Sequence, residues 1–91
     1  MIVRKHLLFS GRVQGVGFRY RARNGAEARG LTGWVRNLWD DRVEMEVQGD
    51  PEAISLLIAE LCRGTFIRVT GIEEEEIPAE PRESSFRVMG Y

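Results

Sequence analysis

The segment from residue 11 to residue 19, Gly-Arg-Val-Gln-Gly-Val-Gly-Phe-Arg, combines residue types that bind phosphate. Glycines let a backbone approach a ligand closely, and successive N–H groups can then point into one concavity. Arg19 ends the segment, and a guanidinium can hold two phosphate oxygens through parallel hydrogen bonds. A helix beginning here would add unpaired N–H groups and the positive end of its dipole. The segment therefore fits a cradle for a phosphate dianion.

Spacing alone leaves a plain structural turn equally open for this segment. The pattern G-x-x-x-x-G-K-[ST] is absent, because Lys5 is the only lysine. A dinucleotide fingerprint beginning at Gly15 fails, because Tyr20 occupies the third glycine position. Taken singly, Arg19 is typical of a solvated helix residue and Asn37 of a turn residue.

The elements that must position this segment follow from periodicity. Alternating apolar and polar residues predict strands over residues 4–12, 31–38, 42–48, 66–77 and 85–89. Helical spacing predicts helices over residues 18–29 and 50–64, the second with Asp50 as N-cap and Pro51 at its first position. The order βαββαβ plus a short C-terminal strand predicts an α+β fold of the ferredoxin-like, split β-α-β type. We expect residues 1–91 to form a single domain with a mostly antiparallel sheet and two helices on one face.

The predicted arrangement of strands and helices indicates where several side chains should lie. In the first strand, Leu7 and Phe9 should face the core, and Arg4 and His6 the other side. His6 is expected at the surface or at a sheet edge. Cys62, late in the second helix, is expected to pack, with an exposed thiol as the alternative. The two tryptophans, Trp34 and Trp39, should cover the sheet or a turn, and Trp39 could line a pocket beside Asn37.

Composition narrows the function classes. One cysteine permits no intramolecular disulfide, and one histidine with one cysteine makes no credible metal site. No apolar run is long enough for a signal sequence or membrane span, so the cytoplasm is the expected compartment. Residues 1–36 carry a net charge of +7 and residues 37–91 carry −8. The basic part attracts anions without distinguishing a small phosphate compound from a polynucleotide.

Two motifs in order resemble the signatures of the acylphosphatase family. Residues 11–19 resemble the first, and Gly-Leu-Thr-Gly-Trp-Val-Arg-Asn, residues 30–37, resembles the second. The passage from residues 43–49 into Asp50 is also similar, and the resemblance is close over residues 4–62 and in layout beyond. The chain departs from the family pattern at Trp39, where many members have proline, and near Asp41, where the usual glycine is missing.

The resemblance implies an acylphosphatase, which hydrolyses carboxyl-phosphate anhydrides without a metal or cofactor. It implies that Arg19 is the catalytic arginine and that Asn37 positions the attacking water. The implied phosphate-binding loop consists of Gln14, Gly15, Val16, Gly17 and Phe18. Such a small set suffices chemically, because the leaving carboxylate is a weak base and phosphoryl transfer depends on positioning and electrostatics. We expect a monomer acting on a small acyl phosphate, with no nucleic acid or membrane as partner.

Two rival functions stay open. An RNA-binding module is compatible with a ferredoxin-like sheet and a basic half, although Glu44 and Glu46 on the clearest strand would repel phosphates. The second rival is a carbamoyl-phosphate-handling domain of the same fold, as in the acylphosphatase-like part of larger maturation factors. Turnover by the isolated chain separates that rival from a free-standing enzyme.

Overall fold

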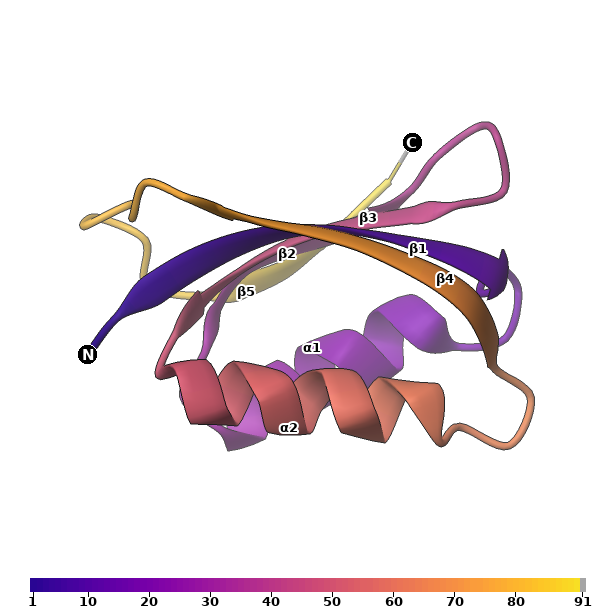
Figure 1. Cartoon of the computed structure of the whole chain (residues 1–91), viewed down its shortest axis with the longest axis horizontal. Helices are drawn as coiled ribbons and strands as arrows, with labels where there is room; N and C mark the ends of the chain where they lie inside the picture. The colour runs from indigo at the N-terminus through magenta and orange to yellow at the C-terminus, as the bar shows by residue number, and fades with distance from the viewer. Residues whose placement is uncertain (91) are drawn as a thin grey trace.

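The computed structural model describes residues 1–90 as a five-stranded sheet with both helices against one face (Figure 1). In chain order the elements are β1 (Val3–Arg12), α1 (Phe18–Ala28), β2 (Thr32–Asn37), β3 (Val43–Gly49), α2 (Pro51–Cys62), β4 (Arg68–Ile77) and β5 (Phe86–Met89). The strands lie side by side in the order β4-β1-β3-β2-β5. All neighbours are antiparallel except β2 and β5, which run parallel. The predicted α+β, ferredoxin-like fold is confirmed.

The core lies between the sheet and the helices because β3 alternates strictly and β1 turns Leu7 and Phe9 to that side. Leu7 and Phe9 of β1 and Met45 of β3 are fully buried there. On α1, Phe18 is buried and its ring meets the ring of Phe9 edge to face, with centroids 5.0 Å apart. Such aromatic pairs add about 0.5–1.5 kcal/mol beyond the burial of their area. The contact fixes the first turn of α1 against the inner strand β1.

The two helices approach each other closely at a glycine. Gly25 of α1 is buried, and a Cβ built on it would lie 2.7 Å from Cδ1 of Leu57 in α2. Asp50 caps α2 by accepting a hydrogen bond from the N–H of Ala53, as its position before Pro51 predicts. The expectation that Cys62 packs is wrong, and the alternative of an exposed thiol is the one that the structure shows. At 100° per residue, Cys62 is turned away from the buried Leu61 that precedes it.

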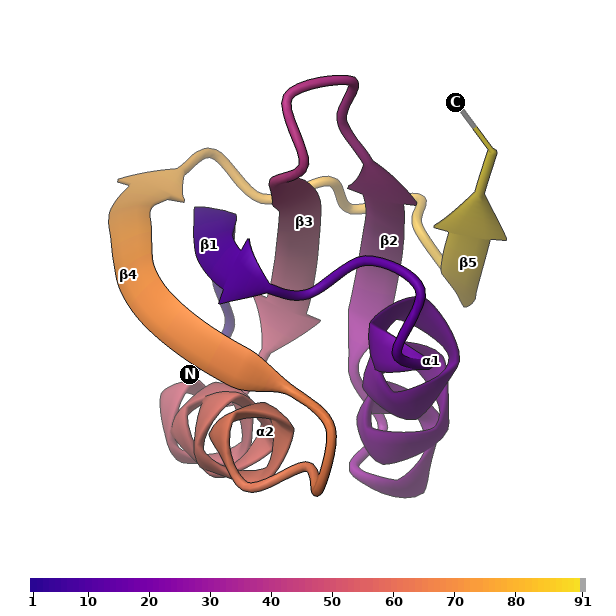
Figure 2. The ribbon, with the colours of Figure 1, turned by 90° about the vertical axis from the view of Figure 1, so that its right-hand side faces the viewer.

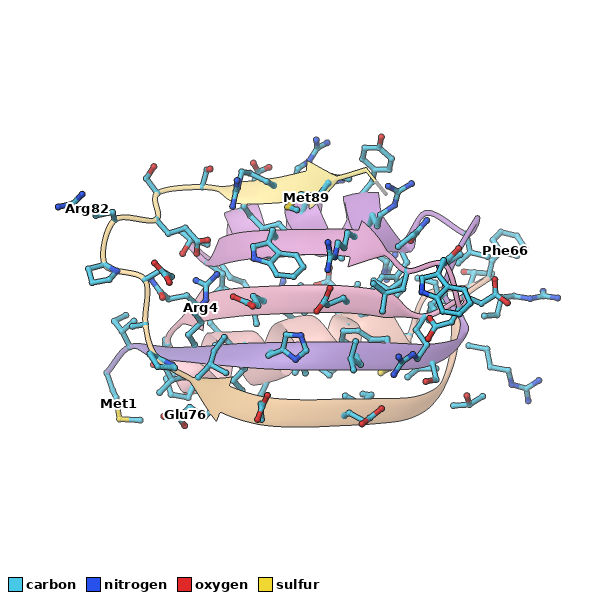
Figure 3. The ribbon with its side chains drawn as sticks, turned by 90° about the horizontal axis from the view of Figure 1, so that it is seen from above. Met1, Arg4, Phe66, Glu76, Arg82 and Met89 are labelled. Carbon is cyan, nitrogen blue, oxygen red and sulfur yellow. The ribbon has the colours of Figure 1, made fainter. Side chains whose placement is uncertain are left out.

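The connection between β4 and β5, residues 78–85, runs around the end of the sheet and is tied to strand residues there (Figure 3). Arg4 was expected to face away from the core, yet it is only 2% exposed. Its guanidinium pairs with Glu83 at 2.7 Å and with Glu46 at 2.9 Å. The side chain of Gln48 accepts from the N–H of Glu80 and donates to its carbonyl. These contacts fasten the connection and thereby help to place β5 beside β2.

A second group of polar contacts lies on the face of the sheet away from the helices. Glu44 accepts from His6 and from Arg36, both at 2.7 Å. His6 lies at the surface as expected but on an inner strand rather than at an edge. The guanidinium of Arg36 also lies over the ring of Trp34, 5.5 Å from its centroid, so Trp34 covers the sheet as expected. The outward carboxylates of β3 are therefore neutralised by neighbours within the sheet.

The edge strand β4 carries the acidic run of residues 73–76, all of them exposed. Charged side chains at this position discourage pairing with the strand of another molecule. Among the described residues, no helix is long and apolar enough to cross a membrane.

Arg4 and Lys5 offer a matched test of buried against exposed ion pairs. We expect Arg4→Ala to lower the free energy of unfolding by about 3 kcal/mol, because it leaves Glu83 and Glu46 without their partner. Lys5 pairs with Glu74 at the open edge, and Lys5→Ala should cost less than about 1 kcal/mol. Urea denaturation of the two variants and the parent measures the difference. Equal losses would mean that Arg4 is not a buried anchor.

The pH dependence of stability offers a second test of this anchor. Burial acts to raise the pKa of Glu83, but hydrogen bonds from Arg4 and Thr32 outweigh it and hold the pKa below its ordinary 4.5. A pKa depressed by folding stabilises the protein above pH 4.5, and this contribution is lost as the pH falls through the folded-state value. Glu83→Gln should therefore lower the melting temperature at pH 6, and the gap to the parent should narrow towards pH 3. A difference in melting temperature that stays constant with pH would contradict the link between the ionisation of Glu83 and stability.

Candidate active site

A glycine-rich loop, residues 13–17, joins β1 to α1 at one end of the sheet (Figure 2). Gly15 and Gly17 have φ angles of +70° and +79°, in the left-handed region that side-chain-bearing residues rarely adopt. A Cβ built on either glycine would meet no other atom within 4 Å. The glycines are thus required by the backbone conformation, and the space in front of them is open.

The helix that follows this loop begins without a cap. Gly17 occupies the N-cap position of α1, and no side chain accepts a hydrogen bond from the first N–H groups. Within residues 1–90, the N–H groups of residues 15–19 have no acceptor. Free donors beside the positive end of a helix dipole attract an anion.

Two of the predicted loop residues use their side chains for packing, so only their backbone groups face the open space. Phe18 is buried in the core, and Val16 packs partly against it. These side chains anchor the loop at its far end, where α1 begins. The N–H groups of both residues remain available to a ligand.

Arg19 lies in the first turn of α1 and is half-buried. Its Nη1 donates a hydrogen bond to the backbone carbonyl of Met89 at 3.1 Å. No carboxylate of the described residues pairs with its guanidinium. Met89 is the register partner of Arg36 in the parallel ladder of β2 and β5. The contact therefore places the positive charge of Arg19 beside the C-terminal end of β2.

Asn37 is the last residue of β2 and is 7% exposed. Its Oδ1 atom is buried and has no hydrogen-bond partner among residues 1–90. Leaving such an acceptor unpaired costs about 1–3 kcal/mol. Because Asn37 directly follows Arg36, it lies at the same end of the sheet as Arg19.

The side chain of Gln14 has a role that the sequence did not predict. Its Nε2 donates to the carbonyls of Leu38 and Arg42, at 2.6 and 2.9 Å. The N–H of Leu38 in turn donates to the carbonyl of Arg42 across the β2–β3 turn. Gln14 therefore ties the glycine-rich loop to the residues that follow Asn37. No sequence pattern signals this bond, because its acceptors are backbone carbonyls far away in the chain.

The β2–β3 turn also carries Trp39, which is 91% exposed and so covers neither sheet nor turn. It does line a shallow pocket of about 340 Å³, together with Arg36, Asn37 and Leu38. Asp41 adopts a φ of +73°, in the left-handed region, close to where the usual glycine of the family pattern is missing. The turn thus contains a left-handed residue that is not glycine, and its tryptophan projects into solvent.

The charged residues of the described part of the chain form no cluster of three His, Cys, Asp or Glu side chains suited to a metal ion. At the loop end of the sheet, the groups available to a ligand are backbone N–H donors, the guanidinium of Arg19 and the carboxamide of Asn37. This set can hold a phosphoryl group and orient a water molecule, since phosphoryl transfer requires mainly positioned charge and hydrogen bonds.

Comparison with known proteins gives a consistent family. The family model described as Acylphosphatase matches residues 5–88. A protein named "Acylphosphatase" from Geobacillus thermodenitrificans is 45% identical over 87 residues, covering 94% of this chain and 93% of the relative. The crystal structure of acylphosphatase from Bacillus subtilis superposes with a TM-score of 0.88 at 34% identity, covering 98% and 99% of the two chains. The crystal structure of T. kodakarensis HypF has a TM-score of 0.82 at 32% identity, covering 96% of this chain but 12% of that one.

Replacing Gln14 tests whether its side chain holds the loop to the turn. Gln14→Ala should lower the free energy of unfolding by about 1–2 kcal/mol, because two carbonyls lose their donor. Gln14→Glu has almost the same shape but cannot donate when ionised, so near neutral pH it should cost at least as much. Chemical denaturation at pH 7 measures both. A harmless Gln14→Glu would show that shape, and not the two hydrogen bonds, is what matters.

Proposed function

This chain belongs to the acylphosphatase family, hydrolases that act on acid anhydrides, and we propose how its own residues divide the work of that reaction. Arg19 and the N–H groups of residues 15–19 hold the phosphoryl group, and Asn37 orients the attacking water. The observation that carries the proposal is the buried Oδ1 of Asn37, which has no partner among the described residues and lies at the same end of the sheet as Arg19, whose charge no carboxylate of those residues balances.

The proposed step needs neither a strong base nor an acid. The water oxygen attacks phosphorus, and the bond from phosphorus to the acyl oxygen breaks with its electron pair leaving as a carboxylate. A phosphoryl oxygen accepts the proton of the water, so the substrate serves as its own base. The carboxylate leaves unprotonated because it is a weak base at neutral pH. Positioning and charge stabilisation are therefore the work left to the protein.

The donors and acceptors of each group support the task proposed for it. Arg19 can keep one N–H on Met89 and present its others to phosphoryl oxygens, since a guanidinium has five donors in a fixed fork. The loop donors add dipoles that are already aligned before substrate binds. The amide oxygen of Asn37 accepts from a water, and this fixes the direction of the oxygen lone pair that attacks. We also propose that the reaction needs no metal, because this set already supplies the positive charge.

The arrangement of the loop and the central strand supports the two alternative functions, an RNA-binding module and a carbamoyl-phosphate-handling domain, less well. The glycine-rich loop leads into a helix, while RNA-recognition aromatics lie on central strands. The central strand β3 presents carboxylates engaged by His6, Arg36 and Arg4. A domain that handles carbamoyl phosphate within a larger protein would share the same site, and turnover by the isolated chain distinguishes the two cases.

We expect the purified chain to hydrolyse benzoyl phosphate in the presence of chelator. Arg19→Ala and Asn37→Ala should each lower kcat/KM by a factor of about 100–1,000, the usual cost of removing one pre-organised contact to a transition state. Arg23→Ala, on the same helix with its guanidinium over Tyr20, is the matched control and should retain activity. Loss of activity on adding chelator would refute metal independence.

Inhibition by inorganic phosphate separates the two roles. Arg19→Ala should raise the inhibition constant for phosphate, since the anion loses its charged partner. Asn37→Ala should leave that constant nearly unchanged, because the amide is assigned to the water. A parallel rise in both variants would show that Asn37 binds phosphate instead.

A further inference from the structure

On the side of the loop away from Asn37 lies a pocket of about 590 Å³ that the proposed reaction does not use. Its lining includes Arg12, Thr65, Phe66, Ile67 and Arg68. Arg12 ends β1, two residues before the glycine-rich loop's Gln14, and Arg68 begins β4. Phe66 is 72% exposed and stands at the loop end of the sheet in Figure 3, opposite Arg82. The pocket is large enough for a small organic group.

The two arginines of this pocket are held together without any acid to balance them. Arg12 and Arg68 are direct register partners in the antiparallel ladder of β1 and β4, just beyond the irregularity at Gly11. Among residues 1–90, neither guanidinium takes part in a hydrogen bond or ion pair. Like charges directly opposite each other destabilise a sheet. An anionic ligand would relieve that repulsion.

The direction of the reaction places the acyl group on this side. In phosphoryl transfer the attacking and leaving oxygens lie roughly in line on opposite sides of phosphorus. If Asn37 holds the water at the end of β2, the acyl group leaves away from β2. The sheet order β4-β1-β3-β2-β5 puts β1 and β4 on that opposite side, as Figure 2 shows. Arg12 and Arg68 are the cations that these two strands present at the loop end.

We propose that Arg12, Arg68 and Phe66 form an acyl-group subsite that selects acyl phosphates carrying a second anionic group, either a carboxylate or a phosphate. The proposal rests on the function assigned to Arg19 and Asn37. The guanidinium pair binds the distal anion, and the Phe66 ring packs against the carbon skeleton between the two charged ends. A polynucleotide fits this surface less well, because a longer anion continuing along β4 would meet residues 73–76, which are all acidic.

The test compares rigid substrates that differ only in the distal group. They are 4-methylbenzoyl phosphate, 4-carboxybenzoyl phosphate and 4-phosphonobenzoyl phosphate, each corrected for its uncatalysed rate. For the parent, the kcat/KM of at least one anionic substrate should exceed that of the methyl compound about tenfold, as one charge-assisted contact can provide. The anion with the larger ratio identifies whether carboxylate or phosphate is recognised.

The variants locate the effect. In the double variant Arg12→Gln/Arg68→Gln, the ratio of kcat/KM for the anionic substrate to kcat/KM for the methyl compound should fall to about one. The fall should come mainly from a higher KM for the anionic substrate, while turnover of the methyl compound and the melting temperature do not decrease. Arg82→Gln removes the same charge at the far end of the sheet and should leave the ratio unchanged. A ratio near one in the parent, or an equal fall in Arg82→Gln, would overturn the subsite and leave the proposed function standing.

Two further outcomes would also decide against the subsite. If the parent hydrolyses none of the three substrates, the proposed function fails and the subsite fails with it. If the double variant keeps its ratio but loses salt-sensitive binding to a single-stranded RNA, the arginine pair is a nucleic-acid contact.

Discussion

The edge-to-face contact between Phe9 and Phe18 is the interaction on which the site depends. Phe9 lies on an inner strand near the end of β1, and Phe18 opens α1, so their contact clamps the two sides of the glycine-rich loop. A loop held only at exposed ends would sample many conformations, and its N–H groups would not stay aligned. Because both rings are buried in the core, the two ends of the loop are held in place and the loop has fewer conformations available.

Several polar groups at the loop end of the sheet have no partner among the described residues, unlike the paired side chains of Arg4 and Glu44. Arg4 and Glu44, on the outer face, each have ion-pair or hydrogen-bond partners within the protein. Arg19 lacks an acidic partner, and Asn37 buries an amide oxygen without one, while the first N–H groups of α1 have no cap. Unpaired polar groups reduce stability, and they persist where a ligand completes them. The contrast between the two regions is itself an argument that the loop end binds a ligand.

The sequence was sufficient for the elements and their order because local patterns dictate them. The strict alternation of β3 and the Asp50–Pro51 start of α2 are signals that neighbouring residues supply. The sequence was not sufficient where the burial or hydrogen bonding of a side chain depends on residues far away along the chain. Arg4 is buried by a connection almost 80 residues away, and Gln14 binds carbonyls of the β2–β3 turn. The exposure of Cys62 and Trp39 likewise depends on which neighbours pack against them.

The candidate site shows the same division between local and distant information. The glycines and Arg19 form one contiguous motif, so the loop could be predicted from the residues and recognised by resemblance. The carbonyl of Met89 in β5 accepts a hydrogen bond from Arg19, and Met89 is in register with Arg36 of β2. This contact brings the guanidinium towards the end of β2, where Asn37 is the last residue. β5 is in turn placed by the connection that Arg4 and Gln48 hold. The ion pairs on the outer face therefore support the site from the opposite end of the sheet, although none of them touches it.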